Sequence, residues 1–350
     1  MKVYNTSVNY LKALGISLMV FGHSGIIDHE ISFIYMFHMP LFFIASGYCF
    51  KEKYLSAPRQ YIYNKVRGIY WPYVKWSLLF LLLHNVCFNL HIYSGQYGWK
   101  EHVSHLYAPS KFLGCAISII FKMHGHEQLL GGYWFMNALF FGSLIVWPVI
   151  RYVKQPLCGG AILIVINTVL NKTCWQIPFI NISSQAFAAA LLIYIGYSLA
   201  KYRVKTFNYW QIALSLSITL IGSFVWNMAM NQNSYSNKRF VPYIITAVLA
   251  SWSFYSLFDK MKSSHCICAK ILDFIGKNTL TILTWHFLAF KLVSLLIIGV
   301  YGLPIERLAE FPVITEYSQQ GWWIAYFIVA MVATCGIANC NKWIKNNWLK

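Results

Sequence analysis

Ten long apolar runs divide this sequence, and no other feature restricts its fold as strongly. A helix needs about 20 apolar residues to cross the hydrocarbon layer of a bilayer. Runs close to this length recur along the whole chain, and short polar connectors separate them. They lie at 7–27, 31–50, 70–91, 132–151, 156–171, 183–201, 209–229, 240–258, 278–298 and 321–340. We therefore predict an all-α polytopic integral membrane protein with about ten transmembrane helices.

The rest of the chain offers little room for a second domain. The apolar stretch 111–122 is too brief to span, and we expect an interfacial or re-entrant helix there. The first apolar run has no small-residue cleavage site, so it is expected to stay as a helix. We find no repeat, low-complexity tract or long linker, and residues 1–350 are expected to form one membrane domain without a separate soluble domain.

Composition excludes the common soluble classes. The chain is 58% hydrophobic and 11% charged, with a mean hydropathy of +0.51, whereas soluble domains are about a quarter charged. The net charge of +18 comes from Lys and Arg scattered in connectors, which argues against nucleic acid as a partner. The nine Cys show no repeated pair spacing, so we expect buried free thiols, no metal site and no permanently bound cofactor.

The basic residues also predict an orientation. With the N-terminus in the cytoplasm, 18 of the 28 Lys and Arg fall on the cytoplasmic side, seven on the other side and three within spans. Loops on the cytoplasmic side of membrane proteins carry an excess of such residues. Both termini are therefore expected in the cytoplasm, which requires an even number of spans.

Two ionisable groups interrupt the first run. Lys12 and His23 are eleven residues apart, so they project from nearly the same face of a helix, about 16 Å apart along its axis. Such groups are costly in a bilayer and are functional candidates by default. Two structural alternatives stay open: Lys12 could reach the cytoplasmic headgroups, and His23 could bond a neighbouring helix as a neutral side chain.

Several motifs resemble one known family. A Lys, ten residues and a His on the first helix look like the signature of the membrane-bound acyltransferase-3 family. "FHMPLFFIASGY" (37–48) resembles its second-helix motif, and "NKVRGIYWPY" (64–73) its basic, Pro-containing segment. "YWFMNALF" (133–140) and "TLTILTWHF" (279–287) are similar to later motifs. Asn9 and Asn64 depart from the Asp and Arg that the family often has there.

The resemblance implies an activity and its substrates. An acyl group, most simply acetyl, would pass from acyl-CoA as co-substrate to a hydroxyl of a cell-surface polysaccharide or its lipid-linked precursor, of the O-antigen, capsule or exopolysaccharide type. The protein would lie in a bacterial inner membrane. A transporter or flippase for a lipid-linked sugar is the alternative, but it predicts structural repeats and broken helices in matching halves, which we do not find.

The same resemblance suggests roles for individual residues. His23 is expected to act as the general base on the sugar hydroxyl, since His accepts a proton near neutral pH, and Lys12 to orient the donor or balance charge. Arg67 and Lys65 can bind the phosphates of CoA, with Tyr73 in the same motif. Residues that could line the cavity or stabilise an oxyanion are Asn9, Ser24, His38, Ser46, Trp134, Asn137 and His286.

Other polar residues carry weaker predictions. Lys75, His84 and Lys291 lie in or near spans without a family motif, and we expect headgroup contacts or helix pairing. Four His in the segment 92–131, including His102 and His105, lack the spacing of metal ligands. Acidic residues on the outer side, such as Glu310 and Glu316, are either acceptor contacts or solvated loop residues.

Overall fold

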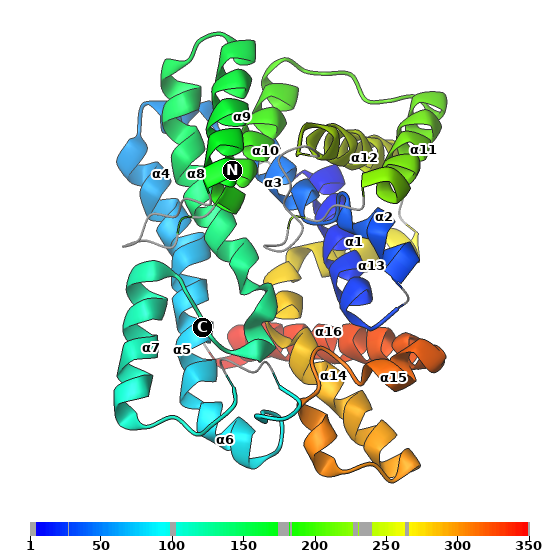
Figure 1. Ribbon diagram of the computed structural model, residues 1–350. Helices are drawn as coiled ribbons and strands as arrows, with labels where there is room; N and C mark the ends of the chain where they lie inside the picture. The colour runs from blue at the N-terminus through cyan, green and yellow to red at the C-terminus, as the bar shows by residue number, and fades with distance from the viewer. Residues whose placement is uncertain are drawn as a thin grey trace. The chain divides into compact units, whose positions relative to one another are not determined.

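Helices make up about four-fifths of the chain that the structure describes. The computed structural model describes residues 5–26, 28–98, 103–173, 182, 184–226, 230, 240–262 and 266–348, and these hold no β-strand. The predicted all-α class is confirmed for these residues (Figure 1). Lys100 and His102 lie outside the described residues.

A helix occupies every predicted run. The principal helices are α1 Thr6–His23, α2 Asp28–Tyr35, α3 Pro40–Tyr48, α4 Pro58–Lys65, α5 Trp71–Leu82, α6 His84–Asn89, α7 Pro109–Lys122, α8 Trp134–Tyr152, α9 Pro156–Thr173, α10 Ser184–Lys201, α11 Tyr209–Trp226, α12 Phe240–Met261, α13 Ile267–Lys277, α14 Thr279–Tyr301, α15 Thr315–Tyr317 and α16 Trp323–Trp348. The shorter turns include η2 Val66–Tyr70, η3 Gln128–Tyr133, η4 Ile305–Ala309 and η5 Ser318–Trp322. The stretch 111–122 falls in α7, which is too short to span.

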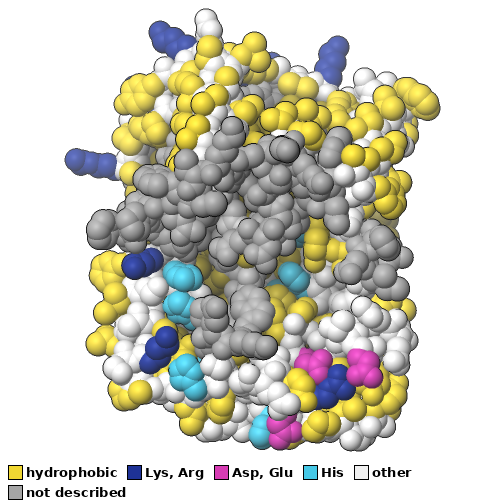
Figure 2. Space-filling view, in the orientation of Figure 1, with side chains coloured by type: hydrophobic (Ala, Val, Ile, Leu, Met, Phe, Trp, Pro, Cys, Tyr) yellow, Lys and Arg dark blue, Asp and Glu magenta, His cyan; other side chains and the backbone are white. Residues whose placement is uncertain are grey.

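Five helical segments are long and apolar enough to cross a membrane. They are Ile31–Tyr48, Gln128–Tyr152, Phe240–Met261, Thr279–Tyr301 and Thr315–Ile344. Large apolar side chains are exposed on several helices, for example Trp210, Ile221 and Phe224 on α11. Figure 2 shows extended areas of hydrophobic side chains on the visible face. Exposed apolar area of this extent is what a helix surrounded by lipid requires, so the chain is a multi-pass membrane protein.

The chain divides into two compact units, each built from separate stretches of sequence. Unit 1 comprises Met1–Gly15, His29–Pro72 and Trp134–Lys277. Unit 2 comprises Ile16–Asp28, Tyr73–Tyr133 and Asn278–Lys350. The helix α1 contributes to both units, with Lys12 in the part that belongs to unit 1 and His23 in the part that belongs to unit 2.

Unit 1 is organised around α10, which packs against α3, α8 and α9. The backbones of α3 and α10 touch at two glycines. A Cβ at Gly47 would lie 1.9 Å from the carbonyl oxygen of Ile193, and one at Gly196 would lie 2.1 Å from that of Ile44. Small residues at helix crossings are how membrane helices gain packing contacts, because lipid offers no hydrophobic drive for their association.

Unit 2 is organised around α14, which packs against α16 and η3. Phe287, Phe290 and Val293 on α14 are each at most 2% exposed. The Phe290 ring lies 5.6 Å from that of Tyr326 on α16. These contacts hold the helix that carries His286 and Lys291 in the core of the unit.

The α3–α10 crossing yields a testable consequence for stability. Replacing Gly196 by Leu forces the two backbones apart, and overpacking of this kind costs about 1–3 kcal/mol. We expect a lower melting temperature in detergent for G196L. The matched control is Gly160→Leu in α9, because a Cβ at Gly160 meets no atom within 4 Å. Equal melting temperatures for G196L and G160L would contradict the close crossing.

Candidate functional site

Two histidines from distant parts of the sequence meet in unit 2. His23 is the last residue of α1, and His286 lies on the buried face of α14. Their ring centroids are 5.9 Å apart, with 27° between the ring planes. The His23 ring also lies 5.0 Å from the ring of Phe287. His23 is partly exposed whereas His286 is completely buried.

The hydrogen bonds of His286 determine its tautomer. Its Nδ1 lies 3.0 Å from the carbonyl oxygen of Leu283 and 3.2 Å from that of Ile282. Carbonyl oxygens only accept, so Nδ1 carries the hydrogen and donates it. The other nitrogen, Nε2, is buried and has no hydrogen-bond partner. A neutral ring therefore leaves an unpaired acceptor lone pair on the buried Nε2.

Polar groups in the turn that follows His23 form hydrogen bonds within the protein. The Ser24 hydroxyl donates to the carbonyl oxygen of Phe21 at 2.7 Å, so this predicted oxyanion donor is engaged within its own turn. Gly25 has a φ of +83°, and a Cβ there would lie 2.2 Å from the Ser318 hydroxyl. Ser318 in turn donates to the carbonyl oxygen of Gly25 at 3.1 Å. This contact anchors the end of α1 to η5.

Unit 1 gathers three lysines around one thiol. The ammonium groups of Lys12, Lys51 and Lys65 all lie close enough to the Cys49 thiol to interact with it electrostatically. Lys12 comes from α1, Lys65 from the end of α4, and Cys49 and Lys51 from the connector after α3. No acidic side chain makes a salt bridge with any of the three among the described residues. A cluster with this excess of positive charge is suited to an anion.

Contacts with α13 hold the first of these lysines. Lys12 Nζ donates to the carbonyl oxygen of Gly276 at 2.9 Å, near the C-terminus of α13, where the helix dipole favours a cation. Asn9 Nδ2 donates to the backbone and side-chain oxygens of Asp273, at 2.9 and 3.1 Å. An Asp at position 9 would place two carboxylates in contact. This contact accounts for Asn9, the first departure from the family pattern.

Lys65 has only weak partners. Its Nζ lies 3.5 Å from the Ser46 hydroxyl and 5.3 Å from the centre of the Tyr61 ring. Burial lowers the pKa of Lys65 to about 8, since little compensates for the lost hydration of the ammonium. An anion beside Lys65 would favour its charged form.

Arg67 and Tyr73 have contrasting surroundings. Arg67 is exposed in η2, a π-helical turn, and makes no ion pair with any described residue. Single-turn π-helices frequently occur at functional positions. Tyr73 belongs to unit 2, where it is buried with its ring 5.6 Å from that of Tyr133.

The remaining predicted cavity residues lie in unit 1. His38 is buried, and its Nδ1 donates to the carbonyl oxygen of Ile34 at 3.0 Å. Trp134 begins α8 and is partly buried, and Asn137 lies one turn further, 6% exposed. Among the described residues, no group of three or more His, Cys, Asp or Glu side chains is arranged to hold a metal ion.

Sequence reasoning missed Cys49, and it was wrong about several cysteines. Five of the eight described cysteines are exposed rather than buried: Cys49, Cys158, Cys266, Cys268 and Cys340. Lys51 was counted only as a cytoplasmic charge. Their position in the sequence could have identified both residues as site candidates, because Cys49 and Lys51 follow the second-helix motif (37–48).

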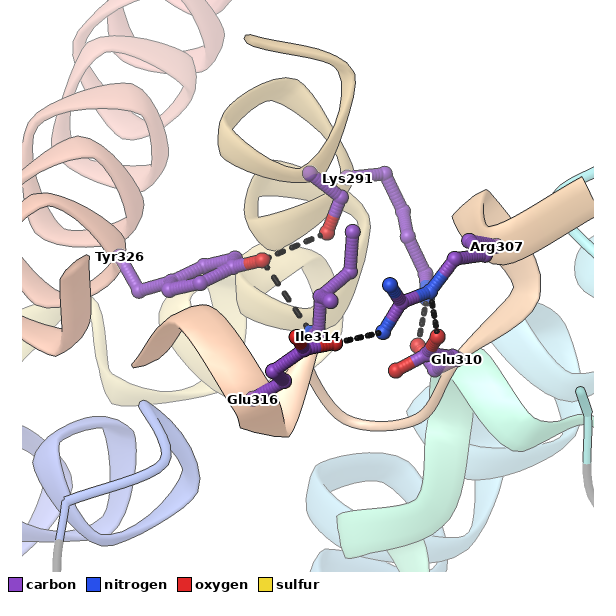
Figure 3. A network of polar contacts seen from close by, with 7 residues as sticks. Lys291, Arg307, Glu310, Ile314, Glu316 and Tyr326 are labelled. Carbon is purple, nitrogen blue, oxygen red and sulfur yellow. Dashed lines mark hydrogen bonds and ion pairs between the residues drawn. The ribbon is translucent and has the colours of Figure 1, made fainter. Parts of the chain in front are cut away.

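The polar residues without a family motif mostly pair inside the protein. His84 Nδ1 lies 3.1 Å from Glu127, and both side chains are buried. Lys291 is 2% exposed and donates to the carbonyl oxygen of Glu310 at 2.6 Å, as Figure 3 shows. Lys75 is exposed, with its ammonium 4.9 Å from the Trp76 ring centre. His84 and Lys291 are therefore held by pairing rather than by headgroups.

Comparison with known proteins identifies the family. A family model for acyltransferase 3, described as an acyltransferase domain, matches residues 5–339. No curated protein and no solved structure matches this chain significantly. The match covers essentially the whole chain, including α1 with Lys12 and His23. The chain therefore belongs to the acyltransferase-3 family of membrane acyltransferases.

Proposed function

We propose that this protein transfers an acyl group, most simply acetyl, from acyl-CoA to a hydroxyl of a cell-surface polysaccharide or its lipid-linked precursor. The observation that carries the proposal is the histidine pair of unit 2. His23 is partly exposed, and the lone pair of His286 Nε2 beside it has no partner. A proton acceptor of this kind is what a sugar hydroxyl needs before it can attack a thioester.

The basic cluster of unit 1 supports a nucleotide donor. Phosphates of acyl-CoA carry several negative charges. Among the described residues, Lys12, Lys51 and Lys65 form no salt bridge, although the Asp273 carboxylate interacts with Lys12. The exposed Arg67 adds a planar fork that can bind a phosphate through two hydrogen bonds. We place this cluster on the cytoplasmic side, where acyl-CoA is made, with ten spans and both termini in the cytoplasm.

The reaction itself needs two proton transfers and one bond exchange. His23 accepts the proton of the sugar hydroxyl, whose oxygen attacks the thioester carbonyl carbon. The carbon–sulfur bond then breaks, and the CoA thiolate leaves and takes up a proton. Transfer through an acyl group held briefly on His23 needs the same unprotonated ring.

His286 acts on His23 rather than on the substrate. Because its Nδ1 hydrogen is committed to backbone carbonyls, its Nε2 can only accept a hydrogen bond. Its ring centroid lies 5.9 Å from that of His23, with 27° between the ring planes, and Nε2 has no hydrogen-bond partner. His286 therefore supports the His23 ring by packing rather than by a hydrogen bond, and we assign it as a positioning residue.

Substitution of the two histidines separates these roles. A general base contributes about 100- to 10,000-fold to rate, so we expect H23A to abolish acylation while the protein still inserts. H286F should lower kcat about tenfold or more and leave the KM for acyl-CoA unchanged. The readout is the mass of surface glycans from cells with and without each variant, which differs by one acetyl group, together with kinetics of the purified protein.

A third histidine supplies the control. His124 is exposed and lies on a connector outside the pair, so H124A should retain wild-type activity. Acylation by H23A at the wild-type rate would remove His23 as the base. Glycans of unchanged mass in cells that do make the wild-type protein would remove the proposed function altogether.

Cys49 reports directly on donor binding. Because its thiol lies near the three lysines, bound acetyl-CoA, whose sulfur is held in a thioester and does not react with the reagent, should slow alkylation of Cys49 by N-ethylmaleimide several-fold. This protection should weaken as the pH rises past about 8, where Lys65 loses its charge, and K65R should retain protection to higher pH. The measurement is the ratio of alkylation rates with and without acetyl-CoA at each pH, which cancels the ionisation of the thiol itself.

The other exposed cysteines provide the comparison within one sample. Cys158 and Cys340 are exposed, and neither is within the lysine cluster. Their alkylation should not respond to acetyl-CoA. Equal effects of acetyl-CoA on Cys49 and on these two thiols would contradict the donor site.

Reporter fusions test the membrane topology. A reporter placed after Lys205 and one at the C-terminus should both report the cytoplasm, whereas one placed after Gly302 should report the opposite side. Fusions after Lys205 and at the C-terminus that report different sides would refute the ten-span arrangement.

A further inference from the structure

Three aromatic side chains gather at one place on unit 2, at the ends of three separate elements. Tyr301 ends α14, Tyr317 ends α15 and Trp322 ends η5. The rings of Tyr301 and Tyr317 are 4.3 Å apart, and Trp322 Nε1 donates to the Tyr301 hydroxyl at 3.1 Å. Tyr301 is 44% exposed, and Tyr317 and Trp322 are partly exposed. We call these three residues the aromatic platform.

Charged side chains border the aromatic platform. The Arg307 guanidinium lies 5.8 Å from the centre of the Tyr317 ring. It bonds Glu310 through Nε and Glu316 through Nη2, the latter at 3.1 Å (Figure 3). The Glu316 side chain is 58% exposed. Its carboxylate therefore still has acceptor sites open beside the aromatic rings.

Buried side chains of unit 2 hold the segment 310–314, which lies between Arg307 and Glu316 in the sequence. Lys291 bonds the backbone of Glu310, and the Tyr326 hydroxyl accepts from the backbone N–H of Ile314 at 3.2 Å. Tyr326 also shares a hydrogen bond of 2.9 Å with Ser294. Buried polar contacts from α14 and α16 thus fix the segment 310–314, and a surface prepared in this way loses little entropy when it binds a ligand.

The aromatic platform is continuous with the turn after His23. Tyr317 directly precedes Ser318, which donates to the carbonyl oxygen of Gly25, two residues beyond His23. The Phe311 ring, next to Glu310 in the sequence, lies 4.6 Å from that of Phe287, which in turn contacts the His23 ring. All of these contacts are within unit 2.

We propose that the aromatic platform, with Glu316 and Arg307, is a subsite for the carbohydrate acceptor, which binds there a sugar unit other than the one that is acylated. This proposal rests on the proposed function and names where its acceptor is held. The apolar C–H face of a pyranose packs on Tyr317 and Trp322. Its hydroxyls donate to the Glu316 carboxylate and accept from the Arg307 guanidinium.

Distance determines the kind of acceptor. Fifteen residues of α14 separate His286 from Tyr301, which is about 22 Å along the helix axis. A single sugar cannot contact both the histidine pair and the far edge of the platform. The acceptor is therefore an oligosaccharide or polymer that has several units, and the platform contributes to affinity for chains but not for monosaccharides.

The test compares Tyr317→Ala and Trp322→Ala with Trp210→Ala in the full-length protein. Trp210 on α11 is 76% exposed and belongs to unit 1, so it controls for loss of an exposed aromatic anchor. The probe is a set of fragments of five to eight sugars from the surface polysaccharide of the cells that make the protein, alongside its monosaccharides. Binding is measured by calorimetry in detergent without acyl donor, and the acceptor KM with acetyl-CoA.

For Y317A and W322A we expect at least fivefold weaker fragment binding and an equally raised KM for fragments. Their kcat, the KM for acetyl-CoA and the KM for monosaccharides should stay unchanged, and W210A should match the wild type. Fragment binding at the wild-type level in both Y317A and W322A would overturn the subsite and leave the proposed function intact. A loss of fragment binding in W210A as large as that in Y317A and W322A would do the same. Platform-dependent binding without any acyl transfer would instead refute the proposed function and leave the subsite standing.

Discussion

Backbone carbonyl oxygens satisfy many of the polar side chains that lie within these apolar helices, and the candidate site depends on that constraint. An unpaired polar group in a medium without water costs several kcal/mol. Lys12 donates to Gly276, Lys291 to Glu310 and His38 to Ile34. These contacts replace part of the hydration that each group loses in apolar surroundings. His286 Nε2 has no such partner, and His23 beside it is partly exposed. We expect the catalytic site where a polar group lacks a hydrogen-bond partner.

The two charged or ionisable positions of α1 serve two different units. Lys12 belongs to unit 1, where its ammonium interacts with the Cys49 thiol and donates to the carbonyl oxygen of Gly276. His23 belongs to unit 2, where its ring packs against those of His286 and Phe287. In our proposal, Lys12 helps to neutralise the donor and His23 activates the acceptor.

Individual residues show which features of the structure could be predicted from the sequence and which could not. The apolar runs predicted where helices lie because a helix that crosses lipid must be apolar over a nearly fixed length. The spacing of Lys12 and His23 predicted a shared helical face, and the family signature selected His286 from among the other intramembrane histidines. The pairing of His84 with Glu127 was not predictable, since 43 residues and a connector separate them. The exposed state of Cys49 was also missed, because composition alone assigns a thiol in an apolar chain to the interior.

The sequence by itself determined the all-helical membrane class and the acyltransferase-3 family, since both depend on the length, hydropathy and spacing of neighbouring residues. Only the tertiary structure decided which polar groups are satisfied and which are not. It brought His23 within 5.9 Å of His286, gathered Lys12, Lys51 and Lys65 around one thiol, and placed Tyr301, Tyr317 and Trp322 together. The physical reason is that hydrogen bonding and packing join groups distant in the chain, and local periodicity carries no information about those partners.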